Sequence, residues 1–317
     1  MMTVSLCVVA YNEASFLPHL LQDFAQHADS FAGVVVLDNP RRVQAAGWNE
    51  AITHSTGEVI IRIDAHTHIP PEFTAKNMAL QEKGEYVTGG VRPCIIEQPT
   101  PWKVTLLEVE NSMFGSSVSK GRKGTQCGYV KSLFHAAYRR EVFEKAGLFN
   151  PRLLRTEDNE MHDRIRKAGY KFYFDPDIVS YQYARSSFGR MLKQKYGNGY
   201  WIGLTLGVCP SCISLFHLVP FAFVLGIAVT TILAFCSIWW SAAVMWAAYL
   251  LFVLAGTLNT VIGKRATRWT FLMPLLFLLL HISYGIGTCV GIAKMPFLRN
   301  ILKTSGEDER EHAGKKI

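Results

Sequence analysis

The sequence has 317 residues, of which 49% are hydrophobic, and its formal net charge is +8. Acidic residues are mixed among the basic ones, and this modest, dispersed charge argues against a nucleic-acid-binding protein. The seven cysteines are scattered along the chain and do not form the framework of a disulfide-rich secreted domain.

Three short apolar runs near the start of the chain predict buried β-strands. They span Val4–Ala10, Val34–Leu37 and Val59–Ile63, and segments with helical spacing at 14–28 and 43–53 separate them. Strands that alternate with helices predict a parallel α/β sheet, in which ligands bind at the carboxyl ends of the strands. The polar residues that follow the three runs are Tyr11-Asn12-Glu13, Asp38-Asn39 and Asp64-Ala65-His66.

The pattern becomes less regular after residue 70. Residues 70–83 predict a helix, residues 86–91 a strand, and residues 102–112 a further helix. Residues 156–168 predict a helix that carries Glu157 and Asp158 in its first turn, where the helix dipole stabilises acidic side chains.

The last third of the chain is almost free of charge. No Asp, Glu, Lys or Arg occurs from Tyr196 to Gly263 or from Trp269 to Ala293. A bilayer core takes about 20 apolar residues per helix. We therefore predict that 211–293 holds about three transmembrane helices. Their expected bounds are about 211–235, 237–260 and 270–293.

The segments around these helices complete the expected organisation. Residues 1–195 predict a cytosolic domain, because the N-terminus lacks the basic segment of a signal peptide. Residues 196–210 predict an interfacial segment, and 294–317 a charged tail, with basic residues suited to anionic membrane lipids. Three spans place the tail outside, whereas its basic residues favour the inside. A re-entrant first segment is the alternative that removes this conflict.

Two groups of residues can carry chemistry. Asp64 and His66, two positions apart just after a strand, can bind a divalent cation from one loop, and Mg or Mn suits these ligands. Glu157 and Asp158 can supply a general base that removes a proton from an acceptor hydroxyl. The alternatives are a structural turn for the first pair and an ordinary helix cap for the second.

Together these residues resemble the family-2 glycosyltransferases of the GT-A fold. The opening strand through Tyr11-Asn12-Glu13, the segment Asn49-Glu50-Ala51, and Gly57-Glu58-Val59-Ile60 before Asp64-Ala65-His66 are similar to that family's first strand, helix and DxD-type metal motif. Thr156-Glu157-Asp158 matches its TED motif. Within the family, the apolar C-terminal segments resemble those of bacterial membrane-anchored exopolysaccharide transferases of the succinoglycan type.

The resemblance implies a fold and a set of roles. The fold would be a doubly wound, mostly parallel GT-A sheet followed by a helical transmembrane region. Asp64 and His66 would hold the metal and Asp158, with Glu157 beside it, would be the base. The nucleotide-sugar pocket would be lined by Ala10, Tyr11, Glu13, Asp38 and Asp64.

One departure from the family concerns the segment between Tyr11 and Asp64. It lacks the acidic Asp-x-Ser-type motif that contacts the nucleoside and follows the second strand. The interpretation adopted is that a strand–helix unit is missing after about Asp23, near the middle of the sheet. Asp38 would then end the family's third strand. The alternative is that Asp38 has taken over the nucleoside role in a compacted domain.

These observations predict an inverting glycosyltransferase of the bacterial inner membrane, multi-pass, with a cytosolic catalytic domain. It would move a sugar from a nucleotide-diphosphate donor to a lipid-linked oligosaccharide or polysaccharide acceptor, in exopolysaccharide or cell-surface glycan synthesis. The alternative is a shortened, catalytically impaired paralogue that acts as a membrane-bound partner.

Overall fold

The computed structural model describes residues 2–10, 16–25, 33–38, 43–112, 124–184, 187–263 and 265–297. Within these ranges the chain divides into two compact units. The first holds the described residues of Met1–Ile95 and Ser119–Tyr183, and the second holds those of Ile96–Val118 and Ala184–Ile301. This division differs from the boundary expected near residue 195, because two helices, α4 (Pro101–Asn111) and α7 (Phe188–Thr205), lie in the second unit.

A seven-stranded sheet forms the centre of the first unit, with the strand order β2-β1-β3-β8-β5-β9-β7. β1 pairs in parallel with β2 and β3, β5 pairs in parallel with β9, and β8 runs antiparallel to both β3 and β5. The mostly parallel sheet expected from the sequence is therefore confirmed. The strands are β1 (Val4–Ala10), β2 (Gly33–Asp38), β3 (Val59–Asp64), β5 (Val87–Val91), β7 (Gly128–Val130), β8 (Ala137–Arg139) and β9 (Phe172–Val179).

A second, three-stranded sheet has the order β4-β10-β6. It is made of β4 (Thr67–His68), β10 (Tyr181–Tyr183) and β6 (Cys94–Ile95), and β10 pairs antiparallel to β4 and parallel to β6. β4 begins three residues after the end of β3, so the small sheet starts close to the carboxyl end of that strand.

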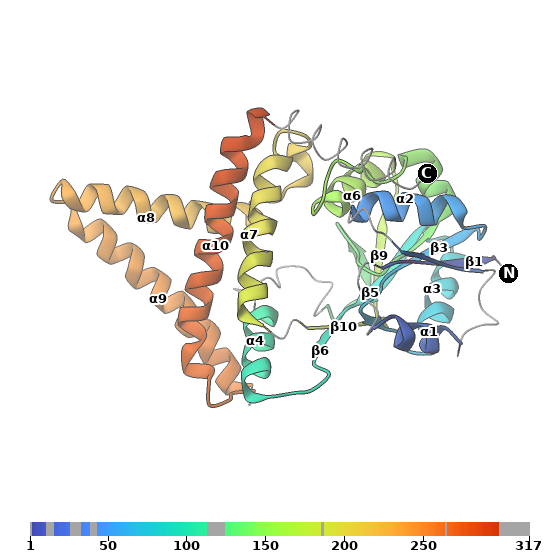
Figure 1. Ribbon diagram of the computed structural model, residues 1–317, viewed down its shortest axis with the longest axis horizontal. Coiled ribbons are helices and arrows are strands. Elements are labelled where there is room, and N and C mark those ends of the chain that lie inside the picture. Colours follow the sequence, from blue (N-terminus) through green and yellow to red (C-terminus); the bar gives the residue numbers. More distant parts are fainter. Residues whose placement is uncertain are drawn as a thin grey trace, which may run out of the picture. The chain divides into compact units, whose positions relative to one another are not determined.

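Helices cover both faces of the large sheet (Figure 1). One face packs against α1 (Leu17–Ala25) and α3 (Phe73–Glu82), and the other against α2 (Gln44–His54), α5 (Arg140–Ala146) and α6 (Glu157–Lys167). Successive side chains of a strand point to opposite faces, so β3 sends Ile60 into one core and Ile61 and Ile63 into the other.

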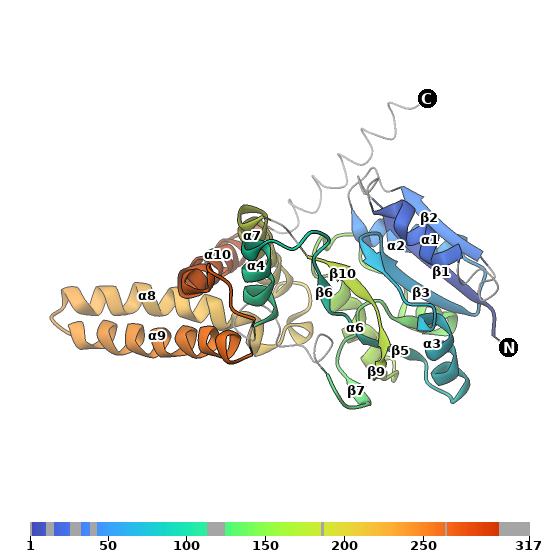
Figure 2. The same cartoon turned by 90° about the horizontal axis from the view of Figure 1, so that it is seen from below.

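β2 is an edge strand that lies directly beside β1, with Ala10 paired to Asp38 at the carboxyl ends (Figure 2). Val34 and Val36 are paired with Leu6 and Val8 of β1, whose side chains are buried in the core beneath α1 and α3. The two valines themselves are 42% and 38% exposed. This face of β2 therefore lacks the cover that the rest of the sheet has. The exposed valines fit the loss of a strand–helix unit, which stays a prediction, although the sheet itself has no gap beside β1.

The second unit is helical and also contains α8 (Val219–Phe235), α9 (Trp239–Ile262) and α10 (Met273–Lys294). α7 and α10 lie side by side (Figure 1), and glycines let their backbones approach closely. A Cβ added to Gly199 would fall 2.0 Å from the Tyr284 carbonyl oxygen, and one added to Gly287 would fall 2.2 Å from that of Tyr196. Small residues at such crossings are typical of helices that pack inside membranes.

Three segments of this unit are long and apolar enough to cross a membrane. They are Leu215–Phe235, Trp239–Ile262 and Thr270–Phe297, with mean hydropathies of 2.4, 1.8 and 1.9. The apolar helical region expected from the sequence is confirmed, with bounds that differ by a few residues. α7 continues to Thr205, so most of the expected interfacial segment 196–210 belongs to a single long helix.

Candidate functional site

The carboxyl end of β3 supplies the first charged side chains of the site. Arg62 and Asp64 are two residues apart and therefore point to the same face of the sheet, the face that α2 and α6 cover. Arg62 is only 8% exposed. A buried guanidinium requires acidic partners, and this chain supplies them from a helix far along the sequence.

α6 begins at Glu157, so Asp158 lies in its first turn, as the sequence predicts. The two guanidinium nitrogens of Arg62 donate to the two carboxylate oxygens of Asp158, and the bond from Nη2 to Oδ2 is 3.1 Å long. Burial by itself would raise the pKa of Asp158, but the charge and hydrogen bonds of Arg62 outweigh it and hold that pKa below its usual range. Asp158 is therefore an anion at neutral pH.

Aromatic rings hold Arg62 in place. Its guanidinium carbon lies 4.6 Å from the ring centroid of Trp48 and 5.1 Å from that of Phe149. Asn49 fixes Phe149, because its side-chain amide donates to the Phe149 carbonyl and accepts from the Phe149 N–H, both at 2.8 Å. The segments around residues 49 and 147–149 thus position the arginine that holds Asp158.

Asp64 has basic neighbours on its other side. Its Oδ2 lies 3.3 Å from His135 Nε2 and 3.8 Å from Arg92 Nη1. Burial would raise the pKa of Asp64, but the hydrogen bond from His135 and the nearby positive charges lower it well below the usual range. Burial lowers the pKa of His135 to about 4, so this imidazole is neutral and can donate from Nε2 while Ser180 Oγ donates to Nδ1 over 2.9 Å.

His135 itself has an unusual backbone conformation, with φ of +48°. Few residues other than glycine adopt this left-handed region, and those that do often lie at functional sites. Here the conformation brings the imidazole from the segment before β8 to the end of β3.

His66 lies in the turn after β3, and the Gln182 side-chain amide of β10 donates to its Nε2 over 2.8 Å. This bond orients the ring, and in this tautomer Nδ1 carries the proton. For Nδ1 to bind a cation, the Gln182 amide must turn so that its oxygen accepts from the Nε2–H. Among the described residues, no cluster of three or more His, Cys, Asp or Glu could hold a metal ion by itself. Asp64 and His66 fit a cation that also binds substrate phosphate oxygens, since Mg²⁺ commonly takes only one or two protein carboxylates.

Glu157 is the most unusual carboxylate of the site. Its side chain is 3% exposed, and its Oε2 has no hydrogen-bond partner within the part of the chain that the structure describes. Burial, together with repulsion from Asp158, raises its pKa above the ordinary value. A buried polar atom of this kind requires an explanation, and a bound hydroxyl group would satisfy it.

The raised pKa makes a prediction about stability. A carboxyl group whose pKa is raised on folding stabilises the folded state fully at pH values below its pKa in the unfolded chain, here about 4.3. This stabilisation is lost as the pH rises toward the pKa of the folded state. Glutamine cannot ionise. We therefore expect Glu157→Gln to raise the thermal midpoint at pH 8 by a few degrees, at about 2–4 °C per kcal/mol, with a smaller gain at pH 4.5. Scanning fluorimetry measures both.

The control for this experiment is Glu144→Gln, which removes an exposed acid of α5 from the same unit. It should leave the midpoint unchanged at both pH values. An equal gain for Glu157→Gln at pH 4.5 and pH 8 would contradict the raised pKa.

The other predicted residues are placed less completely. Ala10 ends β1 and is buried, in line with Asp38 at the end of β2, but the side chain of Asp38 lies outside the described part of the structure. Tyr11 and Glu13 also lie outside the described residues. The structure thus brings together Asp64, Glu157 and Asp158, with His66 in the turn that follows Asp64.

Sequence reasoning missed Arg62, Arg92 and His135. Arg62 could have been found, because an arginine inside the apolar run Val59–Ile63 must be buried and paired. His135 and Arg92 carried no comparable signal, since each reaches Asp64 only through the pairing of the strands.

This chain is similar in sequence and in fold to several known proteins. The family model for glycosyl transferase family 2 matches residues 6–147. Succinoglycan biosynthesis protein ExoA of Rhizobium meliloti (strain 1021) is 27% identical over 172 residues, which cover 52% of this chain and 51% of that protein. The match therefore spans about half the length of that relative.

A second relative matches over a longer stretch. It is the dolichyl N-acetyl-alpha-D-glucosaminyl phosphate 3-beta-D-2,3-diacetamido-2,3-dideoxy-beta-D-glucuronosyltransferase of Methanococcus voltae. The two sequences are 26% identical over 272 residues, which cover 82% of this chain and 79% of that protein. Among solved structures, mannosyltransferase PcManGT from Pyrobaculum calidifontis, in complex with GDP-Man and Mn2+, has a TM-score of 0.52 at 15% identity and covers 91% of this chain and 87% of its own. The expected GT-A fold is thereby confirmed.

Proposed function

This chain carries a glycosyltransferase domain of family 2, and from that premise we propose that it transfers a sugar from a nucleoside-diphosphate donor to a lipid-linked oligosaccharide or polysaccharide acceptor. The product would be an exopolysaccharide or another cell-surface glycan. The observation that carries the proposal is the row of charges Asp64–Arg62–Asp158 at the carboxyl edge of the sheet. It supports a cation ligand at Asp64 and a base at Asp158, because the buried Arg62 is paired with Asp158 and its charge also acts on Asp64.

The donor would bind at the ends of β1, β2 and β3. Ala10, Tyr11, Glu13 and Asp38 would line the nucleoside side, and Asp64 and His66 would hold a divalent cation, Mg or Mn. When bound, this cation would neutralise the charge of the diphosphate leaving group. The Pyrobaculum mannosyltransferase, which has a similar fold, binds GDP-Man and Mn2+, and this supports a nucleotide-sugar donor and a divalent cation for this chain.

Asp158 would act as the general base. The acceptor hydroxyl attacks the anomeric carbon from the side opposite the diphosphate, its proton passes to the Asp158 carboxylate, and the bond to the diphosphate breaks. A single displacement of this kind inverts the anomeric configuration. Arg62 keeps Asp158 ionised before the acceptor arrives. Glu157 Oε2, which has no partner among the described residues, would bind a hydroxyl of the acceptor.

A donor titration tests this function against the alternative of a catalytically impaired paralogue. The full chain in nanodiscs is mixed with Mn²⁺ and each of a panel of UDP- and GDP-sugars, and release of the nucleoside diphosphate is followed with and without membrane lipid extract. We expect release with one donor, stimulated by the extract and removed by chelation. Donor binding without release, or no binding across the panel, would favour the impaired paralogue.

We also propose that the protein is a multi-pass protein of the bacterial inner membrane with its first unit in the cytosol. Cys236 is exposed in the turn between α8 and α9 and would then face the outside, whereas Cys127 is exposed in the first unit. An impermeant maleimide on intact spheroplasts should label wild type but not Cys236→Ser. Cys127→Ser is the control and should reduce labelling only after lysis. Protection of Cys236 until lysis would overturn this topology.

A further inference from the structure

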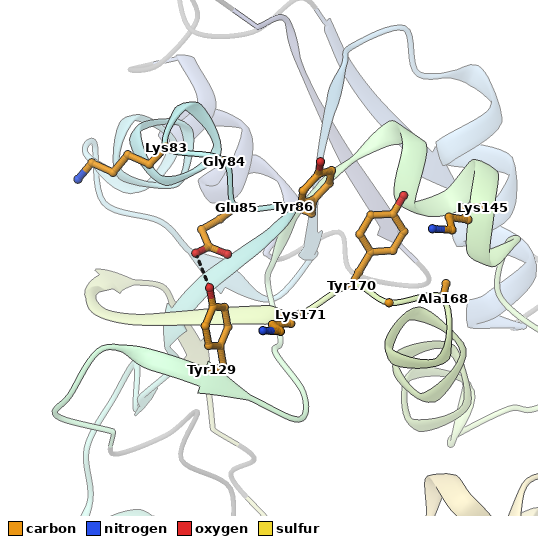
Figure 3. Close-up of a pocket in the computed structure, with 10 residues that line it drawn as sticks. Lys83, Gly84, Glu85, Tyr86, Tyr129, Lys145, Ala168, Tyr170 and Lys171 are labelled. Atoms are coloured by element: carbon orange, nitrogen blue, oxygen red, sulfur yellow. Dashed lines mark hydrogen bonds between the residues drawn. The ribbon is translucent and has the colours of Figure 1, made fainter.

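A cavity of about 420 Å³ opens in the first unit away from the residues discussed so far (Figure 3). Its volume lies within the range of ordinary ligand sites. Lysines, tyrosines and glycines dominate its lining. They are Lys83, Lys145 and Lys171, Tyr86, Tyr129 and Tyr170, with glycines in the adjoining turns.

Two similar turns build this cavity. α3 and α6 each end two residues before a glycine with positive φ, Gly84 at +103° and Gly169 at +95°, and each turn then leads into a strand. The N–H of the residue after each glycine donates back to a helix carbonyl at 3.2 Å. β5 and β9 are parallel neighbours with Val87 opposite Phe172, so Tyr86 and Tyr170 emerge side by side, with ring centroids 5.1 Å apart.

The position of the cavity separates it from the candidate active site. Tyr86 and Lys171 immediately precede β5 and β9, so the cavity lies at the amino ends of parallel strands. Asp64 lies at the carboxyl end of β3, which runs in the same direction. Sugar transfer at Asp64 and Asp158 therefore leaves the cavity without a role.

The lining is cationic and aromatic. Lys145 Nζ lies 5.1 Å from the ring centroid of Tyr170, and Lys171 Nζ lies 5.0 Å from that of Tyr129. Tyr129 is 57% exposed, and its hydroxyl donates to Glu85, the acid of the lining, over 3.0 Å. Figure 3 shows Lys145 and Lys171 beside the tyrosine rings and Lys83 extending away from them at the rim.

We infer that this cavity is a second binding site, for an anionic sugar unit of a glycan. Lys145 and Lys171 lie beside different tyrosine rings, so each ammonium group can pair with a carboxylate or phosphate of the glycan. The exposed tyrosine edges and faces offer apolar surface to a sugar ring. A concave site suits a single projecting unit better than a flat lipid surface. The choice of a saccharide over other anions rests on the proposed function. The site itself does not.

Binding of a hyaluronan hexasaccharide, which carries carboxylates on alternate sugars, tests the inference without any donor or turnover. Calorimetry on the full chain in neutral-lipid nanodiscs compares wild type with Lys145→Gln, Lys171→Gln and the control Lys131→Gln, which removes an exposed lysine outside the cavity. We expect each of the first two to weaken binding about fivefold and the control to leave it unchanged. Maltohexaose, which has no charge, should bind at least about tenfold more weakly.

Several outcomes would overturn the site. Equal weakening by Lys131→Gln would mean that net charge alone attracts the probe, and equal binding of maltohexaose would remove the requirement for an anion. Saturable binding of inorganic phosphate with no gain for the hexasaccharide would exclude a saccharide. Binding to phosphatidylglycerol vesicles that Lys145→Gln and Lys171→Gln weaken, without hexasaccharide binding, would assign the lysines to the membrane. If transfer fails but the hexasaccharide binds as expected, only the proposed function falls.

Discussion

Asp64→Asn is expected to reduce both sugar transfer and donor hydrolysis at least about a hundredfold, because it removes the carboxylate that would hold the cation on the diphosphate. Asparagine keeps the size of the side chain and can still accept from His135, so the protein should stay folded. Nucleotide release in the presence of Mn²⁺ measures the loss, and circular dichroism checks the fold. Titration with Mn²⁺ should show weakened metal dependence.

The matched control for this experiment is Asp177→Asn, an exposed acid of the same unit that lies outside the candidate site. It should retain wild-type turnover. If Asp64→Asn retains most of its activity while folded, the cation ligand is wrongly assigned.

The second large effect is expected for Asp158→Asn. Removal of a general base costs typically 10²- to 10⁴-fold in rate, so transfer should fall by about this factor. Donor affinity should change little, because the base acts on the acceptor and Asp158 contacts Arg62 rather than the nucleotide pocket. Stopped-flow or calorimetric titration of the donor, beside turnover, separates the two quantities.

A conservative change at Arg62 adds a second readout for this assignment. Arg62→Lys keeps the charge but loses the bidentate geometry, so turnover should fall while Asp158 remains ionised. If Asp158→Asn loses donor affinity and turnover in equal proportion, Asp158 belongs to the donor site and is not the base.

Much of the architecture could be predicted from the sequence because it depends on local patterns. Continuous apolar runs predict β1 and β3, since strands buried on both faces have no polar alternation. The uncharged stretches from Tyr196 onward predict the apolar helices, since a bilayer excludes charge. Asp64 and Asp158 could be chosen because a strand end and a helix start are recognisable from neighbouring residues alone.

Other features depended on contacts between distant segments and could not be read from the sequence. α4 lies in the helical unit, where Leu106 and Val109 pack into one core with Met191 and Phe277, and its own sequence does not identify these partners. The cavity between the two glycine turns exists only because β5 and β9, far apart in the chain, are neighbours in the sheet.

The sequence by itself thus determined the class of fold, the apolar helices and the acidic residues of the candidate site. Only the tertiary structure decided that Arg62 lies against Asp158 and that His135 lies against Asp64, so that both acids are held as anions. The physical reason is that a pKa depends on burial and on charges a few ångströms away. Arg62 and His135, which make these contacts, lie tens of positions from Asp158 and Asp64 in the chain.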